Sequence, residues 1–165
     1  IYGCLVGSEM CIRDRQLIEY NARFGDPEAM NVLSILDSDL IEICEAIISG
    51  SLNKTKIIFK NLATVCKYAV PDGYPDDPVK GHQIDVSQVK NKNMLFYASV
   101  ENKNDNLIQI GSRAIALVGH GETIWEAEEI AEKNILKVKG PLFHRKDIGT
   151  TDLIQKKINH MSSLT

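Results

Sequence analysis

Residues 17–28 read Leu-Ile-Glu-Tyr-Asn-Ala-Arg-Phe-Gly-Asp-Pro-Glu, and this stretch decides the fold that we expect. In an extended strand, successive side chains point to opposite faces. One face of this stretch is then apolar, with Ile18, Tyr20, Ala22 and Phe24. The opposite face carries an acid, an amide and a cation, Glu19, Asn21 and Arg23. The alternation predicts a strand with one face against a core and one polar face.

The end of this stretch predicts the start of a helix. Gly25 interrupts the strand, and Asp26, Pro27 and Glu28 follow it. Aspartate is a favoured N-cap, proline fits the first helical position, and an acidic side chain in the first turn interacts well with the helix dipole. We therefore expect Asp26 to cap a helix that begins at Pro27.

The polar face has the residue types of a metal and anion site. Mg²⁺ prefers hard oxygen ligands and often shares its site with phosphate oxygens. Glu19 and Asn21 are two positions apart on one face, so both could reach the same ion. Arg23 could hold a carboxylate or phosphate through two parallel hydrogen bonds. The alternative is an exposed strand face on which Glu19 and Arg23 screen each other, and these three residues alone leave both interpretations open.

The whole stretch resembles the hallmark of the phosphoribosylamine–glycine ligases, the glycinamide ribonucleotide synthetases, which are ATP-grasp enzymes of purine synthesis. The match consists of Glu-Tyr-Asn at 19–21 followed by Arg-Phe-Gly-Asp-Pro-Glu at 23–28. Two later segments also resemble the family, Gly-Tyr-Pro at 73–75 and Arg-Lys-Asp-Ile-Gly at 145–149. The resemblance extends over about residues 16–160. For the segment 145–147 we favour a structural role.

The resemblance implies an ATP-dependent carbon–nitrogen ligase that joins glycine to 5-phosphoribosylamine through glycyl phosphate. It implies ATP as co-substrate and Mg²⁺ or Mn²⁺ as the metal, held by Glu19 and Asn21 beside the ATP phosphates. Arg23 is then the candidate catalytic residue that binds an anionic substrate group. Asp26 and Glu28 either position substrate or cap the helix.

Arg113 is a further candidate for binding substrate or ATP. The segment Gly-Ser-Arg at 111–113 stands where family members carry a glycine pair and an arginine before a strand. A positive charge there could stabilise a phosphate group during transfer. Arg113 could equally be a surface residue that opens a strand, and both interpretations remain open.

The order of predicted elements indicates an α+β fold. We expect residues 1–15 to be a non-native leader, residues 16–60 to form the C-terminal end of an ATP-grasp domain, and residues 61–165 to form a small antiparallel-sheet domain with packed helices. Predicted strands cover 62–70, 94–100, 107–110 and 114–118, with a hairpin turn at 102–106. Predicted helices lie at 30–36, 40–49, 124–139 and 151–160. Three N-caps are expected: one residue within 37–39, Thr123 (in a capping box with Glu126), and one of Thr150 and Thr151.

Composition limits the classes of partner. The 165-residue chain has a net charge of −3 and a hydrophobic fraction of 44%, which is typical of a globular protein and argues against a nucleic-acid partner. No apolar run is long enough to span a membrane. Cys44 and Cys66 lie in apolar patterns, so we expect them to be buried, reduced thiols in a cytoplasmic protein. His120, between two glycines, is expected to be a turn residue.

We do not expect the chain alone to catalyse the ligase reaction. It has no glycine-rich phosphate loop before Glu19, so we expect weak ATP binding and no ligase activity without a larger enzyme. Two alternatives remain open. One is a different ATP-grasp ligase, such as a carboxylase component of the same pathway, and the other is a stand-alone binding module that has lost catalysis.

Overall fold

A computed structural model describes residues 23–163 of the chain. Outside the described residues lie the expected leader over 1–15 and five residues of the predicted strand: Ile18, Glu19, Tyr20, Asn21 and Ala22. Arg23 and Phe24 are described, and neither is in a strand.

A four-stranded antiparallel sheet forms the centre of the fold, with strand order β3-β6-β1-β7. The two long central strands are β1 (Ala63–Pro71) and β6 (Ile115–Gly121), and they pair from Ala63 opposite Gly121 to Ala69 opposite Ile115. The short outer strands are β3 (Leu95–Tyr97) and β7 (Leu142–Phe143). The predicted strands at 62–70 and 114–118 are confirmed. His120 is on β6, so the expectation of a turn residue is wrong.

A second, three-stranded antiparallel sheet has the order β2-β5-β4, with β2 at Gln83–Ile84, β4 at Val100–Lys103 and β5 at Asn106–Gln109. Asn104 and Asp105 join β4 to β5 and have positive φ angles of 50° and 61°, as expected for a two-residue hairpin loop. The hairpin predicted at 102–106 is therefore confirmed.

The strand predicted at 94–100 is split between the two sheets. Lys92–Met94 forms the 3-10 helix η2, Leu95–Tyr97 forms β3, and Val100 begins β4. The division falls at Ala98 and Ser99, whose amides bond to the carbonyls of Ala114 and Arg113. Gly111 permits this turn, since a Cβ there would collide with the Ser99 side chain.

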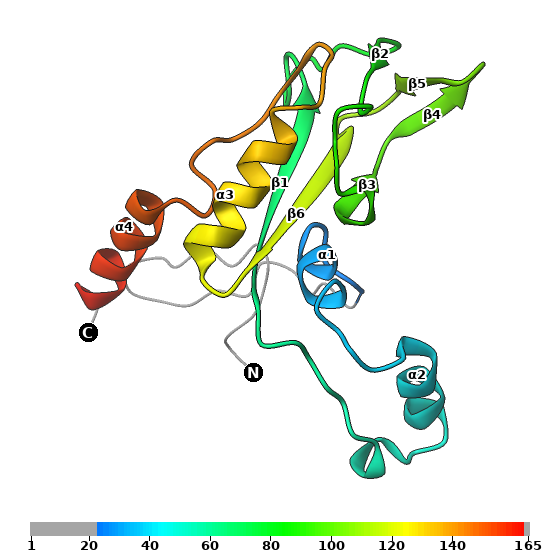
Figure 1. The fold of residues 1–165 in the computed structure, drawn as a ribbon, viewed down its shortest axis with the longest axis vertical. Coiled ribbons are helices and arrows are strands. Elements are labelled where there is room, and N and C mark those ends of the chain that lie inside the picture. Colours follow the sequence, from blue (N-terminus) through cyan, green and yellow to red (C-terminus); the bar gives the residue numbers. More distant parts are fainter. Residues whose placement is uncertain (1–22, 164–165) are drawn as a thin grey trace.

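Helix α3 (Ile124–Ile135) covers one face of β1 and β6 (Figure 1). Its start is the predicted capping box, in which the Thr123 hydroxyl accepts from the Glu126 amide and the Glu126 carboxylate accepts from the Thr123 amide. Ala127, Ala131 and Ile135 are its buried residues. The helix ends four residues before the predicted limit, and Lys139 instead forms a bridge with Asp85.

The largest apolar cluster lies where the two sheets and α3 meet, and contains Ala69, Ile84, Val89, Leu95, Ala114, Ile115, Leu117 and Ile135. Residues from β1, β2, β3, β6 and α3 contribute to it, so the second sheet is packed onto the first. The predicted combination of antiparallel sheets with packed helices is confirmed.

The first described segment contains α1 (Glu28–Leu33), α2 (Leu40–Ile48) and the 3-10 helix η1 (Leu52–Lys54). Figure 1 shows α1 against the central strands, whereas α2 and η1 lie away from both sheets. Asp39 caps α2 as predicted, accepting hydrogen bonds from the amides of Ile41 and Glu42, and Gly50 follows the helix with a φ angle of +68°.

Helix α2 does not bury the face that its apolar pattern predicted. Ile48 is 87% exposed and Cys44 is also exposed, so the expectation of a buried thiol at Cys44 is wrong. Cys66 is buried as expected. The reason is that Ala46 is the single buried residue of α2, which has no sheet beside it among residues 23–163.

Helix α4 (Thr151–Ser162) is amphipathic and is capped by Thr150, whose hydroxyl accepts from the Leu153 amide. Its expected inner face is only partly covered. Leu153 and Ile154 are half-buried, whereas Ile158 is 51% exposed.

A buried ion cluster joins β1 to α3. The Lys67 side chain on β1 is fully buried, and its Nζ lies 2.6 Å from Oε1 of Glu128 and 2.6 Å from Oε2 of Glu132. Lys67 also donates to the carbonyl of Lys146 at 3.1 Å. His144 Nε2 lies 3.0 Å from Oε1 of Glu132. A buried ammonium group is tolerated because three oxygen atoms satisfy it.

We expect Lys67→Met to lower the free energy of unfolding by about 3 kcal/mol, because it leaves two largely buried carboxylates without their cation. Lys133→Met is the matched control. Lys133 Nζ is also 2.6 Å from a glutamate, Glu129, but both side chains are more than 60% exposed. The control should change stability by about 0.5 kcal/mol or less. Urea unfolding measures both values, and equal losses in the two variants would contradict the prediction.

The same cluster predicts a loss of stability in acid. Partial burial acts to raise the pKa of Glu132, but hydrogen bonds from Lys67 and His144 outweigh it and hold the pKa below its ordinary value of 4.5. A depressed pKa stabilises the fold above the unfolded-state pKa, and this contribution is lost as the pH falls through the folded-state pKa. Glu132→Gln should therefore reduce stability more at pH 7 than at pH 3. Urea unfolding of the variant and of the unsubstituted chain at both pH values tests this, and an equal loss at pH 7 and pH 3 would contradict it.

Candidate functional site

The candidate site lies on the face of the central sheet opposite α3. Along β1, Val65 and Lys67 point towards α3, where Val65 packs on Ala127 and Lys67 binds its glutamates. Because side chains alternate along a strand, Cys66 and Tyr68 point to the other face. Met30 of α1 packs there against the same apolar cluster.

Asp26 is the centre of the site. The Tyr68 hydroxyl donates to Asp26 Oδ1 at 2.9 Å, and Arg113 Nη1 donates to Asp26 Oδ2 at 3.1 Å. The Arg113 guanidinium carbon also lies 5.5 Å from the centre of the Tyr68 ring, a cation–π geometry. We call these three residues the Asp26 clamp. The clamp joins the segment that enters α1 to the central sheet.

The expectation that Asp26 caps α1 is wrong. Pro27 takes the N-cap position, α1 begins at Glu28, and no side chain caps its first amides. The physical reason is that Tyr68 and Arg113 engage both carboxylate oxygens of Asp26.

The pKa values at the clamp follow from burial and from these contacts. Burial, with the hydrogen bond to Asp26 next in effect, raises the pKa of Tyr68 well above 10, so its hydroxyl remains a donor at neutral pH. Partial burial acts to lower the pKa of Arg113, but contacts with Tyr74 and Asp26 outweigh it and raise the pKa. Burial, reinforced by Asp26 and Glu28, raises the pKa of Cys66 to about 12, so this thiol is no nucleophile at neutral pH.

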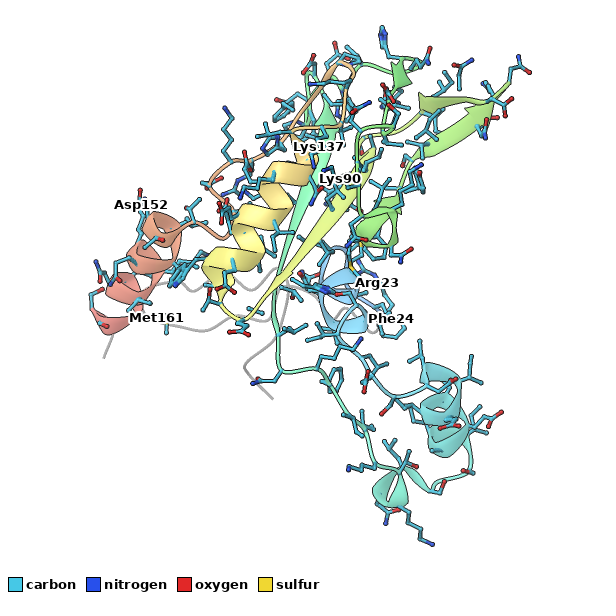
Figure 2. The ribbon with its side chains drawn as sticks, in the orientation of Figure 1. Arg23, Phe24, Lys90, Lys137, Asp152 and Met161 are labelled. Carbon is cyan, nitrogen blue, oxygen red and sulfur yellow. The ribbon has the colours of Figure 1, made fainter. Side chains whose placement is uncertain are left out.

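Arg23 lies beside the site without joining the clamp. Its side chain is exposed, and Nη1 donates to the carbonyl of Phe24 at 2.9 Å. Figure 2 shows Arg23 and Phe24 next to α1. Phe24 is 66% exposed, so its expected place against a core is wrong.

Gly25 and Glu28 form the turn between Arg23 and α1. The Gly25 carbonyl accepts from the Ala29 amide at 2.9 Å. A Cβ at position 25 would meet the Glu28 carboxylate, so the exposed Glu28 side chain would have to move to admit a larger residue. Glu28 is exposed in the first turn of α1 and has no hydrogen bond to Arg113.

The far end of α1 is fixed to β6. Ser34 Oγ and His120 Nε2 are 2.8 Å apart. Burial, together with the nearby charge of Lys60, lowers the pKa of His120, which is therefore neutral at pH 7. The short helix is thus held at both ends, by Asp26 at its start and by Ser34 at its finish.

The structure brings two of the predicted site residues, Asp26 and Arg113, into direct contact. Arg23 and Glu28 are in the same turn as Asp26, and Arg23 donates to the Phe24 carbonyl. Glu19 and Asn21 lie outside the described residues. Sequence reasoning missed Tyr68, because no motif includes it and its place on this face depends on the register of β1 in the folded sheet.

Within residues 23–163, no cluster of three or more histidine, cysteine, aspartate or glutamate side chains could hold a metal ion. Among the same residues, no helix has the length and apolar character needed to cross a membrane.

Comparison with known proteins gives matches over most of the chain. The sequence model of the family described as phosphoribosylglycinamide synthetase, C domain, matches residues 64–151. The phosphoribosylamine–glycine ligase of Methanocaldococcus jannaschii is 50% identical over 166 residues, which cover 98% of this chain and 37% of that protein. The ligase of Pyrococcus horikoshii is 52% identical over 151 residues, covering 90% of this chain and 33% of that protein.

A solved structure has a similar fold. The crystal structure of phosphoribosylamine–glycine ligase from Thermotoga maritima superimposes with a TM-score of 0.61 and 28% sequence identity, over 82% of this chain and 34% of that one. This chain thus spans about a third of the length of the relatives that it matches. The matched residues, the α+β fold and the motifs agree, and the chain belongs to the phosphoribosylglycinamide synthetase C-domain family.

Proposed function

We propose that this chain is part of an ATP-dependent carbon–nitrogen ligase that joins glycine to 5-phosphoribosylamine in purine synthesis. The observation that carries the proposal is the contact between Asp26 and Arg113, which holds the Arg-Phe-Gly-Asp-Pro-Glu turn against the C-domain sheet. The identity of about 50% to ligases of that name supports it over a different ATP-grasp ligase.

The reaction has two steps. The carboxylate of glycine attacks the γ-phosphorus of ATP, which forms glycyl phosphate and releases ADP. The amine of phosphoribosylamine then attacks the glycyl carbonyl, forms the amide bond, and expels inorganic phosphate with loss of a proton. Both steps gather negative charge, so the site needs cations and hydrogen-bond donors arranged in advance.

Arg23 is the proposed catalytic residue. It is exposed and uses one guanidinium nitrogen on the Phe24 carbonyl, and a guanidinium has five N–H donors in all. The remaining donors can bind a carboxylate or phosphate in the bidentate geometry that arginine favours. Arg113 adds positive charge on the same side of the sheet, as a candidate for binding ATP or substrate. Glu28, exposed at the start of α1, is a candidate for positioning the amine.

Glu19 and Asn21 are the proposed ligands of Mg²⁺ or Mn²⁺. A carboxylate and an amide oxygen are the donor types that these ions take, so the residues suit the metal. A bound divalent ion would neutralise part of the charge on the ATP phosphates. Within this chain, the two ligands precede Arg23 by four and two positions, so the metal and the anion-binding arginine belong to one segment.

The domain boundaries are part of the proposal. Residues 1–15 are proposed to be a non-native leader, residues 16–60 to form the end of an ATP-grasp domain, and residues 61–165 to form the C-terminal domain. The start of β1 at Ala63 supports the second boundary. Exposed apolar side chains before it, among them Ile47, Ile48 and Ile58, suit a segment that another part of a larger enzyme would cover. The proposed setting is cytoplasmic, with neither nucleic acid nor membrane as partner.

We expect the 165-residue chain alone to release no ADP in the presence of ATP, glycine and phosphoribosylamine. A hybrid should be active, in which residues 16–165 replace the matching part of the Methanocaldococcus jannaschii ligase, to which the chain is 50% identical. A coupled assay of ADP release measures both. A folded hybrid that is inactive would contradict the proposal and favour the non-catalytic binding module. Turnover with a different acceptor amine would favour another ATP-grasp ligase.

In an active hybrid, we expect Glu19→Gln to raise the Mg²⁺ or Mn²⁺ concentration at half-maximal activity by about tenfold or more, because a charged ligand is lost. Glu122→Gln is the control, since Glu122 is exposed before α3 and outside the candidate site. Titration of activity with each metal tests the prediction. An unchanged metal dependence in Glu19→Gln would remove Glu19 from the metal site.

A further inference from the structure

We propose that Tyr68 is a positioning residue, which acts on the reaction through Asp26 and, together with Arg113, fixes the turn at 23–28 on the C-domain sheet. This inference rests on the proposed function, because the turn carries the proposed catalytic residue Arg23. It gives Tyr68, which no sequence motif includes, a part in the reaction.

The geometry of the clamp divides the Asp26 carboxylate between two partners. Tyr68, which is 42 residues away in the sequence, donates a hydrogen bond to one oxygen. Arg113, which is 87 residues away, donates to the other. Arg113 Nη1 also lies 3.4 Å from the Asp26 carbonyl oxygen. Both the side chain and the backbone of Asp26 are therefore bonded to residues of the C domain, which limits the movement of the turn relative to the sheet.

The two partners are anchored at the buried centre of the fold. Tyr68 is paired with Ala116 in the centre of the sheet, and Arg113 directly precedes Ala114. Ala114, Ile115 and Ala116 have no exposed surface. The Ala114 amide donates to the Ala69 carbonyl at 3.2 Å, so Arg113 begins from a backbone that is itself hydrogen-bonded.

The exposure of the clamp side chains indicates that the clamp fixes the position of the turn and contributes little to the stability of the fold. The Arg113 and Asp26 side chains are 40% and 51% exposed, and exposed ion pairs contribute little to the free energy of unfolding. The Tyr68 hydrogen bond and the stacking of Arg113 on its ring give the pair a defined direction. In catalysis a displacement of about 1 Å can reduce the rate about a hundredfold, so a weak contact can still matter there.

Contacts at the other end of α1 confine the effect of the clamp to the segment before the helix. Ser34 on His120 and Met30 on the sheet hold the helix from its middle to its end. The clamp is the contact that holds the segment before the helix. Loss of the clamp should therefore free residues 23–29 while the rest of α1 remains docked.

Hydrogen–deuterium exchange on the 165-residue chain tests the clamp itself. Tyr68→Phe should raise exchange at the amides of Asp26, Glu28 and Ala29 about tenfold, with the melting temperature almost unchanged. Asp26→Ala should give at least the same increase, because it also removes the ion pair with Arg113. Tyr68→Phe should add nothing in the Asp26→Ala background, because the partner of the Tyr68 hydroxyl is already gone. Tyr97→Phe is the control, a half-exposed tyrosine on β3 of the same sheet. Unchanged exchange in Tyr68→Phe, or additive effects, would overturn the proposal.

Kinetics of the active hybrid test the consequence for the reaction. Tyr68→Phe should lower kcat about tenfold and leave KM for ATP and glycine within about twofold, since the residue positions Arg23 and does not touch substrate. Asp26→Asn, which keeps an oxygen acceptor for Tyr68, should recover part of the activity that Asp26→Ala loses. A rise in KM without a fall in kcat would overturn the positioning role.

The two tests separate the inference from the function on which it rests. If the unsubstituted hybrid is inactive, the proposed function fails together with the role of Tyr68 in that reaction. The exchange experiment still decides whether the clamp holds the turn. If the hybrid is active and Tyr68→Phe matches Tyr97→Phe in kcat, the function stands and the inference fails.

Discussion

The buried ammonium group of Lys67 is the constraint on which the arrangement of this domain depends. A buried cation is tolerated only when oxygen atoms surround it, and here Glu128, Glu132 and the Lys146 carbonyl do so. Helix α3 must therefore cross β1 at this point, and the segment that leads to α4 must pass close by. One side chain thus relates a strand, a helix and the last part of the chain to one another.

The same constraint places the candidate site. Side chains alternate along a strand, so with Lys67 turned towards α3 its neighbour Tyr68 must face α1. A slip of one residue in the pairing of β1 with β6 would exchange the two faces. The ammonium group would then lose its carboxylates, and Asp26 would lose the tyrosine hydroxyl. The core ion cluster and the Asp26 clamp therefore depend on a single register.

Elements with local signals were predicted well from the sequence. The capping box of α3, the Asp39 and Thr150 caps and the hairpin at Asn104 are each formed by residues close in the chain. The failures come from interactions across the fold. Asp26 has good N-cap chemistry, yet its carboxylate binds Tyr68 and Arg113 and does not cap the helix. The apolar face of α2 correctly predicted a helix but did not reveal what would cover it.

The sequence by itself determined the family, the antiparallel character of the sheets and the residue types of the candidate site, because motifs, caps and alternation are patterns of neighbouring residues. The tertiary structure alone decided that Asp26 binds Arg113, that Tyr68 belongs with them, and that Lys67 is a buried ion with two carboxylates. The physical reason is distance along the chain. These partners are 42 to 87 residues apart, and they meet only after strand register and helix docking have put them on the same face of the sheet.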